Sequence, residues 1–399
     1  MEPPTRLMEI RVPRFPRLTH IMILCLATTL PACSEGGGES VVVSDSAGIR
    51  IVSNLGADQP LNWTFSPSFT LGGQDEGPES FYNVRRSSVG TDAAGNIYVL
   101  DADGHRIVMF DSSGDFVRAM GREGEGPGEL SWPFGLSVRP DGTVLVDDIG
   151  KGILVEFAPD GSARNTAEPI LPGSRRVWSD AGLLSSIETR EDEVQTTRFV
   201  RVVGTDTTDL RQLETPVGGM ISLPSCGMGF SGMPLIFAPN LVWDAFGDRA
   251  AVRLGTEYSV DVLIGNDQVS RITRPIGPTP SSDELAGREL GEAMQVMTGG
   301  GLRECATQEL LDQRGVASEL AAIRDLRIDP AGRLWVSRAG PRPESTPTDI
   351  LDADGTYLGT LSADVPYPIG FLPDGRVLVT ETDELDVTRL VVYEIEENS

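Results

Sequence analysis

One short pattern recurs six times along the chain and constrains the fold more than any other feature of the sequence. Each copy is a turn that contains glycine, followed by a short run of β-forming residues, for example TDAAGN-IYVLD from Thr91 and LPDGR-VLVT from Leu372. Turns rich in Asp, Pro and Gly between apolar runs are typical of β-hairpins. The glycines of the six turns are Gly95, Gly142, Gly182, Gly247, Gly332 and Gly375.

The spacing of these glycines indicates the size of the repeating unit. Three of the five intervals are 47, 40 and 43 residues, and propeller repeats occupy roughly 40 to 50 residues. The other two intervals, 65 and 85 residues, imply insertions of about 20 and 40 residues on the same scale. A second hairpin follows most copies, as in RIVMF-DSSGD-FVRAM from Arg106. Each unit therefore supplies four antiparallel strands, here called a to d, which make one propeller blade.

The sequence thus predicts an all-β chain whose residues 48–399 form a six-bladed β-propeller of four-stranded antiparallel blades, with a small helical insertion. The alternative is an open β-sandwich in which the turns resemble one another by chance. Sandwiches do not have a period of this length, so the propeller is favoured.

The last repeat contains only three strands, the third being LVVYEI from Leu390. A copy of strand d lies near the N-terminus instead, where FTLGG from Phe69 resembles FVRAMGR from Phe116, and a Gly-Pro step follows both. We expect this N-terminal strand to close the last blade, with residues 69–72 paired to residues 390–394, because closure removes the exposed edges of the ring.

Residues 1–32 are predicted to be a signal peptide. Three arginines precede an apolar run, residues 21–30, which is too short to span a bilayer. The segment LPAC that ends at Cys33 resembles the lipobox of bacterial lipoproteins. This resemblance implies lipidation of Cys33, followed by a flexible tether over residues 33–47. The alternative is an ordinary cleaved signal with a cysteine placed there by chance.

A lipidated protein of this kind is expected in the bacterial cell envelope, facing the periplasm or the exterior and touching the membrane through its lipid anchor only. The chain carries 33 Lys and Arg against 59 Asp and Glu, a formal net charge of −26. An acidic protein without a basic stripe repels nucleic acid, so a nucleic-acid partner is excluded.

Two cysteines remain after removal of the signal and lipidation of Cys33, namely Cys226 and Cys305. They fall in the links on either side of the fourth blade, and both links leave an outer strand on the same face of the ring. We expect a disulfide between them, because an oxidising compartment favours bridging. The alternative is two separate thiols, since bridging geometry is demanding.

The first two repeats carry the pattern dGxiyVxDxxxxRIxxFDxxGxFvrxxGRxGxGPGE, which resembles NHL-type repeats. The whole chain, including DSAGIRIVSN from Asp45, resembles bacterial lipoproteins described as six-bladed β-propeller proteins. The likeness is sharp in the first two repeats and weak over residues 177–280. NHL-type propellers mostly bind partners, so the resemblance implies the fold and, more loosely, a binding function.

In a four-stranded blade the a–b and c–d turns lie on one face of the ring, while the b–c loops and the links between blades lie on the other. The long segments, residues 216–240 and 281–322, all belong to the second set, here called the long-loop face. Binding usually occurs on such loops. Residues 281–322 are expected to form a helical hairpin, with Ser281 and Glu284 as a capping box and Leu290, Met294 and Met297 as one apolar stripe. The stripe serves either core packing or a lid over a pocket.

Candidate catalytic residues are few, and none is assigned. His105 is the only histidine outside the signal peptide. It lies in a b–c loop of the long-loop face, where a solvated side chain is the simplest interpretation. The motifs of the common hydrolases and nucleotide-binding enzymes are missing. The residues expected to take part in binding on this face are Trp132, His105 and Arg106.

Ca²⁺ is the only cofactor that the sequence suggests. Residues 101–104 and 352–355 resemble calcium loops but lack further ligands. Gluconolactonase-like and strictosidine-synthase-like propellers hold a divalent cation on the ring axis, and Asn83, Asn240 and Asp325 stand near the matching positions. Ordinary capping of strand ends explains these three residues equally well. Trp132, Trp178 and Trp243 are expected in or beside inner strands, either at the channel mouth or in blade packing.

Two functions remain open from the sequence. The favoured one is a membrane-anchored binding or scaffolding propeller that uses its long-loop face for a protein, peptide or carbohydrate ligand. The alternative is a metal-assisted hydrolase or lyase of the same shape.

Overall fold

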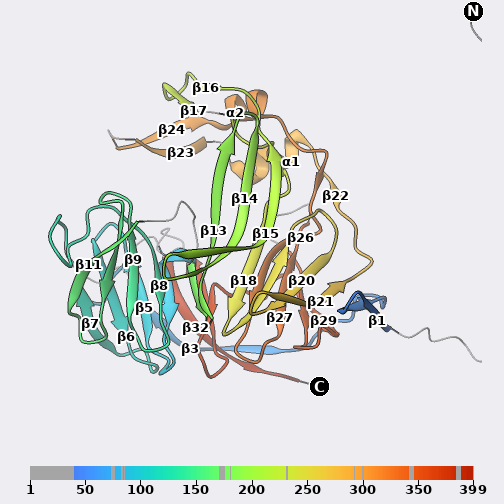
Figure 1. The fold of residues 1–399 in the computed structure, drawn as a ribbon, viewed down its shortest axis with the longest axis horizontal. Helices are drawn as coiled ribbons and strands as arrows, with labels where there is room; N and C mark the ends of the chain where they lie inside the picture. Colours follow the sequence, from blue (N-terminus) through green and yellow to red (C-terminus); the bar gives the residue numbers. More distant parts are fainter. Residues whose placement is uncertain are drawn as a thin grey trace, which may run out of the picture. The chain divides into compact units, whose positions relative to one another are not determined.

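Six antiparallel sheets of four strands each make up the body of the molecule, as the repeat predicts (Figure 1). The first three blades are β4 (Val89–Thr91), β5 (Ile97–Asp101), β6 (Arg106–Phe110) and β7 (Phe116–Met120); β8 (Pro133–Val138), β9 (Val144–Asp148), β10 (Ile153–Phe157) and β11 (Ala163–Pro169); and β12 (Arg176–Ser179), β13 (Gly182–Glu191), β14 (Val194–Val203) and β15 (Asp206–Pro216). The last three are β18 (Val242–Phe246), β19 (Arg249–Arg253), β20 (Ser259–Ile264) and β21 (Asp267–Thr273); β26 (Ile323–Ile328), β27 (Leu334–Arg338), β28 (Thr348–Leu351) and β29 (Tyr357–Leu361); and β30 (Gly370–Phe371), β31 (Val377–Thr382), β32 (Thr388–Glu396) and β3 (Thr64–Leu71).

This computed structural model describes the greater part of the chain after residue 39. The described residues are 40–72, 77–81, 84, 86–169, 176–179, 181–230, 232–291, 293–298, 301–340, 346–382 and 388–398. The signal peptide and Cys33 lie outside these residues, so export and lipidation stay predictions. Among the described residues, no helix is long and apolar enough to cross a membrane.

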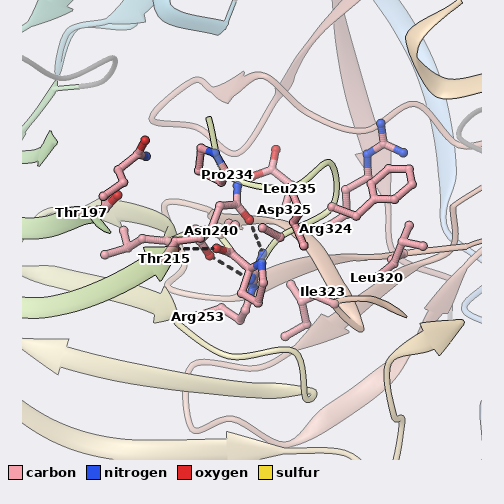
Figure 2. Close-up of a pocket in the computed structure, with 18 of the residues that line it drawn as sticks. Thr197, Thr215, Pro234, Leu235, Asn240, Arg253, Leu320, Ile323, Arg324 and Asp325 are labelled. Carbon is pink, nitrogen blue, oxygen red and sulfur yellow. Dashed lines mark hydrogen bonds between the residues drawn. The ribbon is translucent and has the colours of Figure 1, made fainter. Parts of the chain in front are cut away.

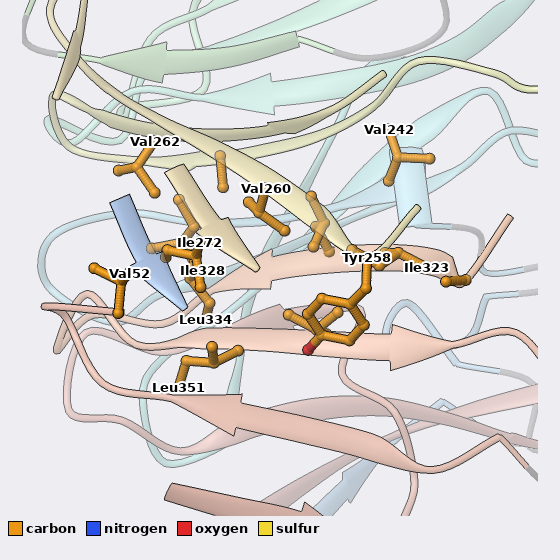
Figure 3. Packing of buried hydrophobic residues seen from close by; sticks show 14 residues of the cluster. Val52, Val242, Tyr258, Val260, Val262, Ile272, Ile323, Ile328, Leu334 and Leu351 are labelled. Carbon is orange, nitrogen blue, oxygen red and sulfur yellow. The ribbon is translucent and has the colours of Figure 1, made fainter. Parts of the chain in front are cut away.

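The blades pack face to face through side chains that alternate along their strands. In β5, Tyr98 and Leu100 pack toward blade two, whereas Ile97 and Val99 pack toward blade six. This is the two-residue period of a strand buried on both faces. Between blades four and five, a further cluster of aliphatic residues surrounds Tyr258 (Figure 3). Hydrophobic burial between neighbouring blades therefore holds the ring together.

The N-terminal strand β3 closes the last blade, which confirms the prediction (Figure 1). It pairs antiparallel with β32, and the register places Phe69 opposite Val392 and Leu71 opposite Leu390. Strands from the two ends of the propeller thus share one sheet, and β3 covers what would otherwise be the unpaired outer edge of β32.

A hairpin that the repeat pattern does not predict precedes β3 in the chain. Its strands are β1 (Val41–Ser46) and β2 (Ile49–Asn54), and β2 pairs parallel with β21 at the outer edge of blade four. The expected flexible tether over residues 33–47 is therefore wrong for residues 41–46. The run VVVS in β1 has the β-branched side chains that favour a strand, and β21 offers a free edge to β2.

Two links between blades form a separate layer on the long-loop face, here called the cap and comprising residues 217–240 and 279–322. Its elements are β16 (Ile221–Leu223), β17 (Met228–Phe230), β22 (Thr279–Pro280), α1 (Asp283–Leu290), β23 (Ala293–Thr298), β24 (Gly301–Ala306), α2 (Thr307–Arg314) and β25 (Glu319–Leu320). A disulfide joins Cys226 to Cys305 with 5.0 Å between their Cα atoms. The predicted bridge is confirmed, and it links the two parts of the cap.

The expected helical hairpin over residues 281–322 is wrong in its middle. Met294 and Met297 lie in β23, which forms a β-hairpin with β24, so the apolar stripe is not helical. The capping box is also displaced, because Ser282 rather than Ser281 caps α1 and accepts a hydrogen bond from Leu285 N at 3.2 Å. The hydroxyl of Ser281 instead donates a hydrogen bond to the carbonyl oxygen of Ala317.

Candidate functional site

A cavity of about 740 Å³ lies between the cap and the propeller body on the long-loop face (Figure 2). Its volume falls in the range of about 300 to 1,000 Å³ that small-molecule sites occupy. The cavity is lined by the middle of blade three, the link before blade four, the first two strands of blade four, the start of blade five, and the cap helices α1 and α2.

Blade three reaches the cavity because its strands are unusually long. β13 and β14 have ten residues each, twice the length of β9 or β10. Figure 1 shows them running from the body of the ring toward the cap. Their ends bring Gln195 and Thr197 to the cavity wall, and the backbone N–H of Val217 in the cap donates to the carbonyl oxygen of Glu193 at 2.8 Å.

Arg253, at the end of β19, is the most deeply buried charged residue that lines the cavity. It is 2% exposed, and its guanidinium donates to the carbonyl oxygen of Asn240 at 2.8 Å, to Asn240 Oδ1 at 2.9 Å and to the carbonyl oxygen of Gly255 at 3.1 Å. Burial lowers the pKa of Arg253 to about 10, so the side chain stays charged at neutral pH. Asn240 holds the guanidinium from two sides and fixes its orientation.

Two further arginines line the upper walls. Arg324, at the start of blade five, forms an ion pair of 2.8 Å with Glu289 of α1. Arg314, the last residue of α2, donates through Nε to the carbonyl oxygen of Pro234, and burial lowers its pKa. The cavity also contains Glu188 and Asp325, so it presents both signs of charge.

The link before blade four carries a conformational outlier into the cavity wall. Phe237 has a φ of 64°, a left-handed conformation that is rare for a bulky side chain. Such a conformation costs on the order of 1–3 kcal/mol and persists only where the surroundings impose it. Leu235, close to it in the same link, lines the cavity and is 44% exposed.

The structure brings together two of the three residues considered as ligands for a cation. Asn240 and Asp325 line the same cavity, while Asn83 lies outside the described residues. Asn240 Oδ1 accepts from Arg253, and Asp325 Oδ1 accepts from Arg327 at 2.9 Å. Both oxygens are therefore bonded to guanidinium groups. Among the described residues, no group of three His, Cys, Asp or Glu side chains is arranged to hold a metal ion.

The two segments that resemble calcium loops act as turns. Asp101 accepts from Gly104 N at 3.2 Å and forms an ion pair of 3.1 Å with Arg106. Asp352 accepts from the backbone N–H groups of Asp354 at 2.9 Å and Thr356 at 2.8 Å. These hydrogen bonds satisfy the two carboxylates in the way that is usual for Asp in turns.

The three residues expected on the binding face gather over blades one and two, away from the cap cavity. His105 Nε2 lies 3.2 Å from the carbonyl oxygen of Ser131, next to Trp132, which is 53% exposed. Arg106 bonds to Asp101 and to the carbonyl oxygen of Ser80 at 2.8 Å, so it holds the Gly-Pro link in place. None of the three lines the cavity.

A second pocket of about 460 Å³ occupies the central channel and opens among the short a–b turns. The first strand of every blade contributes to its lining. Arg176 pairs there with Asp147, and Trp178 lies under the guanidinium of Arg139 at 4.2 Å. Of the expected inner-strand tryptophans, Trp178 thus lines this channel. Trp243 instead borders the cap cavity and packs on Phe199 with ring centroids 4.7 Å apart.

Arg253 and Arg314 were missed in the sequence. Arg253 ends the apolar run AAVR, where an arginine in an otherwise buried strand was a usable signal of an internal partner. Arg314 carried no such signal, because its place depends on how two links remote in sequence pack on each other.

These features define a six-bladed β-propeller with a capped polar cavity on its long-loop face. Among solved structures, a Bacteroides fragilis NCTC 9343 protein provisionally described as exported is 13% identical. It covers 87% of this chain and 99% of its own, with a TM-score of 0.51. A Bacteroides vulgatus ATCC 8482 protein is 12% identical, and the match covers 85% of this chain and 100% of that protein with a TM-score of 0.46. Regucalcin of Agrobacterium tumefaciens is 14% identical, and the match covers 84% of this chain and 96% of regucalcin with a TM-score of 0.40.

No protein-family model matches the sequence, and no curated protein matches it. At 13% identity, the likeness to the Bacteroides fragilis protein shows the fold alone.

Proposed function

We propose that this chain is an exported, lipid-anchored binding propeller that holds a small ligand in the cap cavity. Export is supported by the leader-like residues 1–32 and by the disulfide, since disulfides persist in oxidising compartments. The description of the Bacteroides fragilis neighbour as exported agrees with this proposal.

The observation that carries the binding function is the cavity itself. It combines a deep guanidinium, fixed by Asn240, with apolar walls and several polar groups that converge on one space. Binding sites for small molecules typically have this composition. The cap that covers it is held by the disulfide, so the walls are preorganised, which lowers the entropic cost of binding.

The cavity is tested by blocking its wall. Leu235→Trp places a large side chain in the cavity wall, at a position that is 44% exposed. Leu358→Trp is the control, because Leu358 of β29 is similarly exposed, at 41%, and lies outside the cavity. A fragment library is screened by ligand-observed NMR against the compact unit of residues 39–399. We expect fragments that bind the unchanged protein and Leu358→Trp to be lost in Leu235→Trp. Hits that survive in Leu235→Trp would move the site elsewhere.

Lipidation is tested separately at Cys33. Cys33→Ala in the full chain should shift the protein from the detergent phase to the aqueous phase, or leave it as unprocessed precursor. Mass analysis of the mature N-terminus provides the second measurement. An unmodified N-terminus beyond residue 33 contradicts the anchor but leaves the cavity proposal intact.

The alternative function is a metal-assisted hydrolase or lyase. It requires Asn240 and Asp325 to release the arginines that they now bind and to coordinate a divalent metal ion instead. Elemental analysis of the dialysed protein decides this point, and we expect no stoichiometric divalent cation. A bound cation that is lost in Asp325→Asn would favour the hydrolase.

A further inference from the structure

Arg314 offers unused hydrogen-bond donors to the cavity. Its Nε donates to the carbonyl oxygen of Pro234, and within the part of the chain that the structure describes its guanidinium makes no other hydrogen bond and no ion pair. Both terminal nitrogens are therefore available. Because α2 ends at Arg314 and Gly315 follows as its C-cap, the side chain extends from a defined helix end.

Arg253 adds a second guanidinium that has no carboxylate within ion-pair distance among the described residues. The carboxylate that influences it is Asp325. Asp325 is itself paired with Arg327, which does not line the cavity and which the buried carboxylate of Asp244 also influences. The cavity lining contains three arginines and three carboxylates. Two of these carboxylates, Glu289 and Asp325, are already paired with guanidiniums, whereas Arg253 and Arg314 have no carboxylate within ion-pair distance among the described residues.

The other charged groups of the cavity favour a ligand with a single negative charge. Glu188 and Glu289 also line the cavity. Although Glu289 is paired with Arg324, the two carboxylates repel a doubly charged group such as phosphate more strongly than a singly charged one. A single carboxylate is compatible with them, and its two oxygens match the planar fork of an arginine. Leu235 and Phe237 supply an apolar surface for the body of the ligand.

We infer that the cap cavity recognises a carboxylate, which the terminal nitrogens of Arg314 bind. This inference rests on the proposed function and gives it a ligand class. Free acidic sugars and the C-terminal group of a peptide share this chemistry, and the two are separated by the choice of probes.

Two matched pairs of probes test the inference on the compact unit of residues 39–399 by isothermal titration calorimetry. The first pair is D-glucuronate and D-glucose, and the second is N-acetyl-L-leucine and its amide. We expect the acid to bind at least about tenfold more tightly than its neutral partner in one pair, the size of a charge-assisted hydrogen bond. The pair that shows this difference identifies the source of the carboxylate.

Equal affinity within both pairs, or no binding of either acid, overturns the inference. If a neutral probe binds and Leu235→Trp abolishes that binding, the cavity remains the site while the carboxylate assignment fails. The two proposals can therefore fail independently.

Arg314→Gln assigns the contact to its residue. We expect the acid to lose about tenfold or more in affinity while its neutral partner is unchanged, and Arg314→Lys to restore part of the loss. Arg122→Gln is the control, because Arg122 is an exposed arginine paired with Glu129 at 2.8 Å and lies outside the cavity. An unchanged acid affinity in a folded Arg314→Gln protein overturns the assignment. The probe pairs decide the ligand class even if this variant does not fold.

Discussion

Arginine residues connect neighbouring blades in this propeller, and Arg274 is the most buried example among the ion pairs of the described chain. It follows β21 in blade four and forms an ion pair of 2.6 Å with Asp349 of blade five. The side chains are 1% and 0% exposed. It also bonds to Asp58 at 2.9 Å and lies 3.7 Å from the ring centre of Tyr357.

Removal of this arginine should destabilise the ring strongly. Arg274→Met removes the closer of the two guanidiniums that pair with the buried carboxylate of Asp349 and leaves Arg338 at 3.6 Å. The expected loss is up to about 3–5 kcal/mol of unfolding free energy. Chemical denaturation provides the measurement, with Arg122→Gln at an exposed ion pair as a control that changes stability by less than about 1 kcal/mol. A loss below about 1 kcal/mol for Arg274→Met would show that the pair does not hold the two blades together.

Asp58 makes a pH-dependent contribution to folding stability, because it also pairs with Arg274. Burial raises its pKa, but hydrogen bonds and charges from Arg338 and Arg274 outweigh burial and leave the pKa below its ordinary value of 3.8. A carboxylate with a lowered folded pKa stabilises the protein above its unfolded pKa, and this contribution disappears as the pH falls through the folded pKa.

Asp58→Asn should therefore cost less than about 1 kcal/mol at pH 7, because the side chain is half exposed. The difference from the unchanged protein should shrink below about pH 4. Urea unfolding of both proteins between pH 7 and pH 3 measures it. A difference that stays constant over this range would contradict the assigned ion pairs.

At the scale of elements, β3 is the strand that closes the ring. Leu71 in β3 is 4% exposed and packs with Phe81 and Leu390 in the core between blades six and one. Val43 in the N-terminal hairpin is 52% exposed, although it also lies in a strand.

Leu71→Ala should cost about 2–5 kcal/mol, and Val43→Ala less than about 0.5 kcal/mol. Thermal and urea unfolding measure both. Similar small effects of the two substitutions would mean that β3 is not needed to stabilise the closed ring.

Turn chemistry made the blades predictable from the sequence, and the cap was not predictable in the same way. Gly95 and Gly142 have φ of 83° and 84°, which only glycine adopts without strain, so their turns mark the hairpins. In the cap, Met294 and Met297 fit a helical period as well as a strand. The three glycines at residues 299–301, which separate the runs 293–298 and 302–306, were the signal for a hairpin. The cavity depends on contacts between two links, and no local pattern encodes them.

At the scale of the whole molecule, the disulfide holds the cap together rather than the ring. Cys226 and Cys305 contribute with Ile221, Leu223 and Leu310 to a small core inside the cap. The bridge closes a loop with a sequence separation of 79 residues. In the chain-entropy model such a bridge contributes up to about 4 kcal/mol.

The double change Cys226→Ser and Cys305→Ser should therefore loosen the cap before it affects the propeller. We expect faster proteolysis within residues 217–240 and 279–322, followed by a slower loss of the ring, when cleavage is followed by mass spectrometry. Reduction of the unchanged protein should give the same fragments. Cleavage that begins within the blades instead would show that the bridge stabilises the ring itself.

The pairing of β3 with β32 also determines when this protein can finish folding. β3 is among the first segments of the propeller to leave the ribosome, and β32 is the last strand to be made. Contacts between residues so distant in sequence form slowly, and the ring keeps an open edge until they do. Blade six therefore cannot be completed until β32 has been synthesised, and a chain delivered from its N-terminus across any barrier closes its ring only after β32 has arrived on the same side.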